Sequence, residues 1–289
     1  MGKDHGNNKT KYRILTFVCA LVCLCCVVWL AAYLIGQRSA QAEVEDLRDV
    51  YISGGDGSAE NTSGNNGVSD GSGETAEPSA EPEIDLSAYG VTDRLVDIAG
   101  LQEEVNRDIY AWITVPGTVI DYPVLQHPEE MDYYLDYNLD GTKGYPGCIY
   151  TQRMNSKDWT DPNTVLYGHN MRDGTMFADL HKFEDRGFFD ENRYIHIYTE
   201  DDRVLVYEIF AAYAGGNEHQ LLMYPIYTED GFQSYLDGIF EHTGWGCNFL
   251  EDRELNAEDR IITLSTCING QADRRYLIQG VLVAEKNSD

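Results

Sequence analysis

The sequence predicts a mainly β domain, a closed or nearly closed barrel with added helices, preceded by one transmembrane helix. Three observations support this prediction. An uncharged apolar run lies near the N-terminus, a Gly/Ser-rich acidic stretch follows it, and many short β-rich runs separated by turn signals fill the rest. Short strands with a few inserted helices are typical of a barrel, and roughly 200 residues suffice for one substantial core. We therefore expect a single folded domain behind a membrane segment.

The apolar run at residues 14–35 contains no charged side chain. At about 1.5 Å of rise per residue, such a helix spans a hydrocarbon core of about 30 Å. Bases precede the run and acids follow it, so the positive-inside rule places residues 1–13 in the cytoplasm and the rest outside the cell. Ala40-Gln41-Ala42 would also fit a signal-peptide cleavage site, but signal h-regions span only about 7–15 residues. The run therefore favours an uncleaved single-pass anchor in the cell membrane.

Residues 36–84 are predicted to form a flexible acidic linker, because Gly, Ser, Asp, Glu and Asn dominate much of the stretch without apolar periodicity. The folded domain then covers residues 85–289. The whole chain carries 49 Asp and Glu against 21 Lys and Arg, a formal net charge of -28. A surface this negative repels phosphate backbones, which argues against nucleic acid as a partner.

Hydrophobic periodicity assigns the elements of the exported domain. The predicted strands cover residues 112–115, 119–125, 147–151, 164–167, 194–198, 204–214, 261–266 and 276–284, with a Pro-Gly turn between the first two. Helices are predicted within residues 85–105, at 176–183 and at 230–241. Strands dominate, as a barrel requires.

The cysteines divide between the membrane segment and the exported domain. Four lie within residues 14–35, where they are interpreted as small apolar residues. The exported domain holds Cys148, Cys247 and Cys267, an odd number, so at least one is free or bonded to another chain. The sequence leaves a Cys148–Cys247 disulfide open. No metal-ligand spacing is visible, so no cofactor is expected.

Cys267 follows a strand-like run, residues 261–266, and precedes a polar, turn-rich loop. The strand before such a residue holds it rigidly, and the loop after it leaves it accessible. This suits a nucleophile, which must be held in place and still be reached by substrate. A free thiol has a pKa of about 8.5 and needs a neighbouring base or cation to become a thiolate. The alternative is a buried structural thiol, the more common role of a cysteine.

Two other strand ends offer the groups that a thiol nucleophile needs. His169 lies just past Gly168, where residues 164–167 run into a turn, and a glycine there permits an unusual backbone conformation. Arg274 and Arg275 open the next strand after the cysteine, and a guanidinium can stabilise an oxyanion. Alternatively, the histidine is a surface residue without function and the arginines are a solvated pair of bases.

These segments together resemble the sortase family of cysteine transpeptidases. The resemblance rests on the Thr-Leu-Ser-Thr-Cys run at 263–267, the upstream Gly-His turn and an arginine that opens the next strand. It covers about residues 85–286 and keeps the family's order His, Cys, Arg. Several segments look like class B: residues 112–124, 133–135 and 167–170, the N-terminal helices, and the helix near 230–241.

The resemblance implies a sortase β-barrel with Cys267 as nucleophile, His169 as general acid/base and Arg275 as the oxyanion-stabilising or substrate-positioning residue. Arg275 is preferred because it directly abuts the strand. Its distance of eight positions from the cysteine is slightly shorter than is usual in the family, which leaves Arg274 open.

By the same resemblance, Ser265 and the backbone N–H of Ile268 would line the substrate site. The segment from about Leu221 to Phe240 would shape specificity. Class B members are not generally thought to need calcium, so we expect activity to survive chelation.

The implied reaction cleaves the C-terminal sorting signal of a secreted protein through a thioester. An amine of a peptidoglycan cross-bridge, or of its lipid-linked precursor, then resolves the thioester at the outer face of a Gram-positive-type membrane. Alternatives are a sortase that polymerises pilins, a hydrolytic cysteine peptidase with the same residues, and a catalytically silent surface-binding domain.

Overall fold

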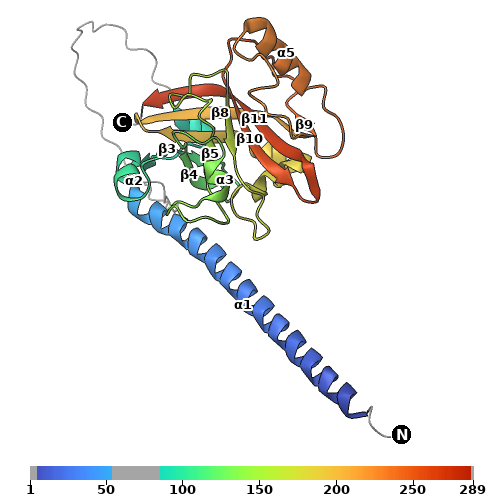
Figure 1. The fold of residues 1–289 in the computed structure, drawn as a ribbon. Coiled ribbons are helices and arrows are strands. Elements are labelled where there is room, and N and C mark those ends of the chain that lie inside the picture. The colour runs from blue at the N-terminus through green and yellow to red at the C-terminus, as the bar shows by residue number, and fades with distance from the viewer. Residues whose placement is uncertain (1–4, 54–84, 288–289) are drawn as a thin grey trace, which may run out of the picture. The chain divides into compact units, whose positions relative to one another are not determined.

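The computed structural model describes residues 5–53 and 85–287 (Figure 1). The chain divides into two compact units, Met1–Leu47 and Arg48–Asp289. The predicted linker falls across their boundary, and its residues 54–84 lie outside the described residues.

A single helix, α1 (His5–Tyr51), makes up the first unit and continues into the second. Its segment Tyr12–Ala31 has a mean hydropathy of 2.8, so by length and composition it could cross a membrane. The helix does not end near residue 35 as the sequence suggests. Residues 36–51 of the predicted linker are therefore helical.

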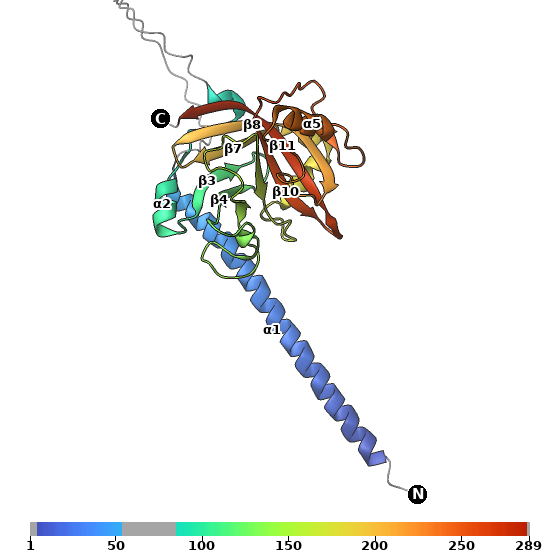
Figure 2. The same cartoon turned by 45° about the horizontal axis from the view of Figure 1, so that its top comes forward.

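The second unit is built around a closed β-barrel, as predicted. Its strands are β3 (Ile109–Thr114), β4 (Asp121–Leu125), β5 (Ile149–Thr151), β6 (Asn163–Tyr167), β7 (Tyr194–Thr199), β8 (Arg203–Gly216), β10 (Ile261–Ile268) and β11 (Gln271–Asn287). In the described residues these eight strands follow the order β11-β10-β6-β5-β4-β3-β7-β8, and β8 pairs again with β11. The short β9 (Asn248–Phe249) adds to β8. Figure 2 shows β10 and β11 side by side along one wall.

Helices surround the barrel. They are η1 (Leu86–Tyr89), α2 (Ile98–Glu104), α3 (Tyr133–Asp136), η2 (Ala178–Glu184), α4 (Arg186–Glu191) and α5 (Glu229–Ile239). The helix predicted at 176–183 is the 3-10 helix η2, and the sequence pattern does not indicate α3 or α4. The short strands β1 (Ile52–Ser53) and β2 (Leu95–Val96) pair outside the barrel.

Helix α5 covers the outer face of β8, β10 and β11. Thr228 caps it by accepting a hydrogen bond from the Gly231 N–H, and two acids in the first turn favour the helix dipole. Its apolar stripe consists of Phe232, Tyr235, Leu236 and Ile239, all buried against the strands. Burial of each such side chain contributes about 1.5–3 kcal/mol, so packing holds this short helix in place.

A buried polar network lies between α5 and the strands. The Tyr235 hydroxyl donates to Gln220 Oε1 at 3.1 Å and accepts from Gln279 Nε2 at 2.6 Å and Asn163 Nδ2 at 3.3 Å. Gln279 also donates to Thr263 Oγ1 at 3.1 Å. Burial raises the pKa of Tyr235 to about 12, so the hydroxyl keeps its proton at neutral pH. The network therefore ties α5 to β6, β10 and β11.

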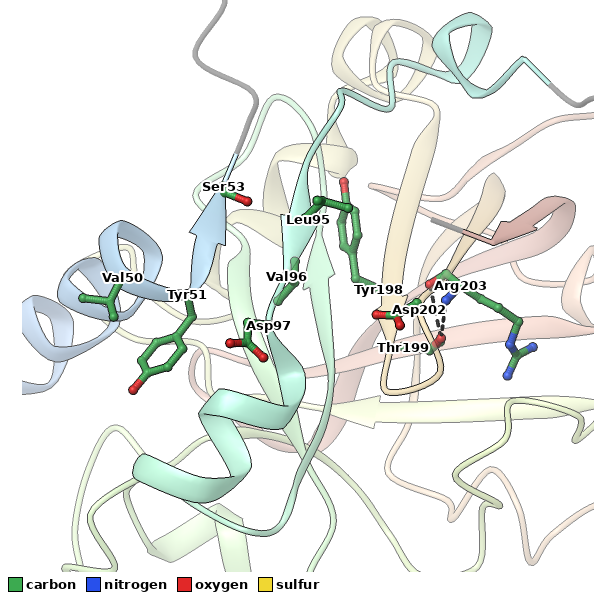
Figure 3. A pocket seen from close by; sticks show the side chains of 10 residues that line it. All are labelled: Val50, Tyr51, Ser53, Leu95, Val96, Asp97, Tyr198, Thr199, Asp202 and Arg203. Atoms are coloured by element: carbon green, nitrogen blue, oxygen red, sulfur yellow. Dashed lines mark hydrogen bonds between the residues drawn. The ribbon is translucent and has the colours of Figure 1, made fainter. Parts of the chain in front are cut away.

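A cavity of about 500 Å³ lies beside the β1–β2 pair and the turn between β7 and β8. Figure 3 shows its lining, which includes Leu95, Asp97, Thr199 and Arg203. The candidate catalytic residues do not line it, so this cavity is not the site indicated by the sequence.

Candidate active site

Parallel pairing of β6 with β10 brings Cys267 and His169 together. Ser265 of β10 pairs with Tyr167 of β6. Cys267 lies two positions after Ser265, and His169 lies two positions after Tyr167. The pairing continues past the last assigned pair, because the Gly168 N–H donates to the Ser265 carbonyl at 3.2 Å. Neighbouring strands lie about 4.8 Å apart and matched positions face the same side. Cys267, near the end of β10, and His169, just past the end of β6, are 98 positions apart in sequence and therefore lie at neighbouring strand ends.

Antiparallel pairing of β10 with β11 brings Arg275 to the same place. Arg275 is the direct partner of Cys267, so the two side chains share a face with Cβ atoms about 4.5–5.5 Å apart. Its Nη1 donates to the carbonyls of Ala272 at 3.0 Å and Arg274 at 2.9 Å. Arg274 belongs to the opposite face and donates through Nη2 to the Ala214 carbonyl of β8 at 2.8 Å. The strand register thus favours Arg275 over Arg274 as the cation beside the thiol.

Position 168 has no room for a side chain, so only glycine fits there. A Cβ at this position would lie 2.7 Å from Cδ2 of Phe177, well inside van der Waals contact. Its φ angle is not among the positive ones, so the unusual backbone conformation expected from the sequence is not the reason for this glycine. The Gly168 carbonyl also accepts from Thr266 Oγ1 at 2.8 Å, which holds the turn against the cysteine strand.

The imidazole of His169 is oriented by a backbone carbonyl. Nε2 lies 2.8 Å from the Leu135 oxygen, and because a carbonyl can only accept, Nε2 carries the proton. The Tyr145 ring lies 5.0 Å away between ring centroids. This hydrogen bond fixes the tautomer in which Nδ1 is the available base.

The remaining candidates flank Cys267 on its own strand. Ser265 is buried at 5% exposure and lies on the Cys267 face, whereas Cys267 itself is exposed. The β10–β11 register shifts between Cys267 and Ile268, so Ile268 lies at an irregularity next to a tight turn. That turn contains Gly270, whose φ of 75° favours glycine.

Three further residues lie at the site that the sequence analysis does not single out. Asn170 Nδ2 lies 2.9 Å and His181 Nε2 lies 3.0 Å from the Cys267 carbonyl oxygen. Glu184 Oε1 lies 2.6 Å from His181 Nδ1. Asn170 could have been suspected because it follows His169. His181 and Glu184 are part of an ordinary amphipathic pattern, and no sequence signal distinguishes them.

The other two exported cysteines are not bonded to each other. The described cysteines form no disulfide, so the Cys148–Cys247 bond that the sequence left open is not present. Cys148 is buried, with Sγ 3.4 Å from the Tyr137 carbonyl. Among the described residues, no three His, Cys, Asp or Glu side chains gather as a metal site would require.

The chain is similar to known proteins in sequence and in fold. A family model described as Sortase domain matches residues 113–283. The chain is 34% identical over 199 residues to sortase B of Listeria monocytogenes, which covers 68% of this chain and 76% of that protein. It is 30% identical over 165 residues to sortase B of Staphylococcus aureus, covering 57% of this chain and 65% of that protein.

Solved structures agree with the sequence relatives. The X-ray structure of Clostridium perfringens sortase B matches with a TM-score of 0.58 at 30% identity, over 64% of this chain and 100% of that one. A Staphylococcus aureus sortase B–substrate complex matches with a TM-score of 0.55 at 26% identity, over 63% of this chain and 82% of that one. The chain therefore belongs to the sortase family and is a sortase B-like cysteine transpeptidase.

Proposed function

We propose that Cys267 is the nucleophile of this transpeptidase and that His169 and Arg275 act with it. One observation supports the proposal: Cys267 pairs with Arg275, not Arg274, and His169 lies just past the end of β6, the parallel neighbour of the cysteine strand. A thiol, a base and a permanent cation are the groups that acyl transfer through a thioester needs.

The proposed reaction begins when the Cys267 thiol gives its proton to Nδ1 of His169 and the resulting thiolate attacks a backbone carbonyl of the sorting signal. The new C–S bond forms a tetrahedral intermediate, whose oxyanion the Arg275 guanidinium stabilises. As the C–N bond breaks, His169 gives its proton to the departing amine, leaving a thioester. An incoming amine then loses a proton to His169 and attacks the thioester, which releases Cys267 and forms a new amide.

We infer that the donor is the C-terminal sorting signal of a secreted surface protein and that the acceptor is an amine of peptidoglycan or its lipid-linked precursor. A sortase B–substrate complex and a sortase B complexed with triglycine are among the solved relatives, each 26% identical to this chain. The segment from Leu221 to Phe240, which includes α5, is proposed to shape the donor site. Ser265 and the Ile268 N–H would line it.

The N-terminal helix supports the proposed location. We propose that residues 14–35 remain as an uncleaved anchor, with residues 1–13 in the cytoplasm and the catalytic unit outside the cell. The apolar segment Tyr12–Ala31 is consistent with either an anchor or a signal sequence. Mass spectrometry of the protein extracted from membranes distinguishes them, because a chain beginning after residue 42 would contradict the anchor.

A peptide assay tests the function. The full chain in detergent is incubated with a peptide library of sorting-signal length, with and without triglycine, and products are identified by mass spectrometry. We expect cleavage with an amine-dependent ligation product. Cleavage that yields only the free acid with or without triglycine would favour the hydrolytic peptidase, and ligation to a pilin-type lysine peptide in a third arm, but not to triglycine, would favour pilus assembly.

Single substitutions test the residues. Cys267→Ala and His169→Ala should abolish turnover, and Cys267→Ala should also prevent trapping of a thioester. Cys247→Ala is the control, because Cys247 is a free, partly buried thiol that is not one of the proposed catalytic residues. If Cys267→Ala retained turnover, the proposed nucleophile would be wrong and another residue would have to attack the sorting signal.

A further inference from the structure

The backbone carbonyl of Cys267 is held by two side chains from the segment that follows β6. Asn170 Nδ2 donates to it at 2.9 Å, and His181 Nε2 lies 3.0 Å from it. The regular β10–β11 ladder is interrupted immediately after this residue. These side chains therefore hold the strand end at the point where the sheet no longer determines its position.

His181 has its own support. It lies on η2, three positions before Glu184, and its Nδ1 is 2.6 Å from Glu184 Oε1. Its ring stacks on Tyr276 of β11, with 5.1 Å between centroids and 25° between planes. Burial raises the pKa of Tyr276, and its hydroxyl donates to the Gly246 carbonyl at 2.8 Å, so it is a neutral, fixed platform. The imidazole is thus held from two sides.

The partners assign the protons of the His181 ring. A carboxylate can only accept, so Nδ1 carries a proton toward Glu184, and a carbonyl can only accept, so Nε2 carries one toward Cys267. Asn170 Nδ2 also lies 3.0 Å from His181 Nε2, so both side chains gather at the Cys267 carbonyl. The His181 side chain is 22% exposed at the edge of a cavity of about 800 Å³.

We propose that His181, oriented by Glu184, is a positioning residue that fixes the Cys267 backbone and thereby the direction of its thiol. Asn170 is the neighbour of His169 and donates to the same carbonyl, so one clamp sets the position of the nucleophile relative to its base. The proposal rests on the proposed role of Cys267. His181 does not touch the substrate in this scheme, and its effect reaches the reaction only through Cys267.

Two substitutions separate the hydrogen bond from the ring stacking. His181→Gln keeps an N–H donor of similar reach but has no aromatic ring to stack on Tyr276. His181→Phe keeps the ring but has no donor. Positioning through the carbonyl predicts that the Gln variant works better than the Phe variant, whereas a purely structural role in stacking predicts the reverse order.

The measurement is the rate at which iodoacetamide alkylates Cys267 in the full chain in detergent. Tryptic mass spectrometry follows the Cys267 peptide separately from the other cysteines. Turnover of a sorting peptide gives kcat and KM for the same variants. His127→Ala is the matched control, because His127 also stacks on a tyrosine, Tyr133, at 4.3 Å, and in the described part of the chain its hydrogen bonds go to Glu129 and Glu130 rather than to Cys267.

We expect His181→Phe to lower both the alkylation rate and kcat about tenfold with KM unchanged, the effect of about 1.4 kcal/mol. His181→Gln should stay within about threefold of the parent, and His127→Ala should match it. Equal rates for the Phe variant and the parent, a Gln variant at least as impaired as the Phe variant, or a change confined to KM would each overturn the proposal. Thermal unfolding of each variant shows whether the fold is intact.

Cys267→Ala in the same assay separates this inference from the proposed function. If Cys267→Ala is inactive and His181→Phe is fully active, only the positioning role fails. If Cys267→Ala still turns over, the proposed nucleophile fails, and the His181 result no longer concerns catalysis.

Discussion

Removing one buried hydroxyl should destabilise the barrel and its α5 covering together. Tyr235→Phe keeps the ring, which is 3% exposed, and deletes only the oxygen at the centre of the polar network. Within the part of the chain that the structure describes, Asn163 Nδ2 and Gln220 Oε1 bond only to this hydroxyl, whereas Gln279 Nε2 keeps its bond to Thr263. The substitution therefore leaves two buried polar groups without partners.

The magnitude follows from those two groups. Leaving a buried donor or acceptor unsatisfied costs about 1–3 kcal/mol, so the free energy of unfolding should fall by about 2–6 kcal/mol. This is a large share of the roughly 5–15 kcal/mol by which domains are stable. Asn163 is fully buried and Gln220 is 8% exposed, so relaxation toward water should be easier at Gln220 and bring the loss toward the lower end.

Urea unfolding of the full chain in detergent, followed by tryptophan fluorescence, measures this loss. Tyr227→Phe is the control, because Tyr227 is 58% exposed and its change should remain within about 0.5 kcal/mol. A loss below about 1 kcal/mol for Tyr235→Phe would refute the reasoning, since the two orphaned groups would then have found other partners.

Three more predictions follow from the site and the core. Arg275→Ala should reduce kcat by about 10²–10³, or about 2.7–4 kcal/mol, in the peptide assay; a larger loss for Arg274→Ala would reverse our assignment. Burial lowers the pKa of His196, so below about pH 6.5 the unfolded chain binds a proton at this histidine more readily than the folded chain, and the free energy of unfolding should fall as the pH drops. His196→Gln should weaken this pH dependence in urea unfolding at pH 5 to 7. An unchanged pH dependence would contradict the prediction. Turnover should persist in EDTA, and loss restored by calcium would show a metal requirement.

Much of the barrel could be predicted because its strands carry local signals. The predicted strands near β6, β10 and β11 fall on those strands, since each is an apolar or β-branched run that ends in a turn. The candidate residues stand out for the same reason, as each lies at such an end. Their meeting could not be predicted from local pattern, because β6 and β10 are parallel neighbours joined through distant parts of the chain.

The sequence pattern could not determine whether Arg274 or Arg275 lies on the same face as Cys267. Ile268 pairs with Gln271 across the turn, and a regular hairpin continuing from that pair would place Arg274 opposite Ser265, on the Cys267 face. Instead, Cys267 pairs with Arg275, so residues 272–274 have no counterpart on β10. This odd number of extra residues reverses which arginine faces the thiol. The turn residues alone do not indicate this shift in the pairing of β10 with β11.

One face of three adjacent strands carries both the polar network and the candidate catalytic residues. On each strand, the network residue and the candidate catalytic residue are separated by an even number of positions. The pairs are Asn163 and His169 on and just past β6, Thr263 and Cys267 on β10, and Gln279 and Arg275 on β11. Side chains two apart on a strand share a face.

Helix α5 covers this shared face at its network end, while Cys267 at the other end is exposed. Tyr235 bonds to Asn163 of β6 and to Gln279 of β11, and Gln279 bonds to Thr263 of β10, so the proposed specificity segment is attached to the same strands that carry the proposed nucleophile, base and cation. Donor recognition and thiol chemistry can then share one rigid frame without any direct contact between α5 and Cys267.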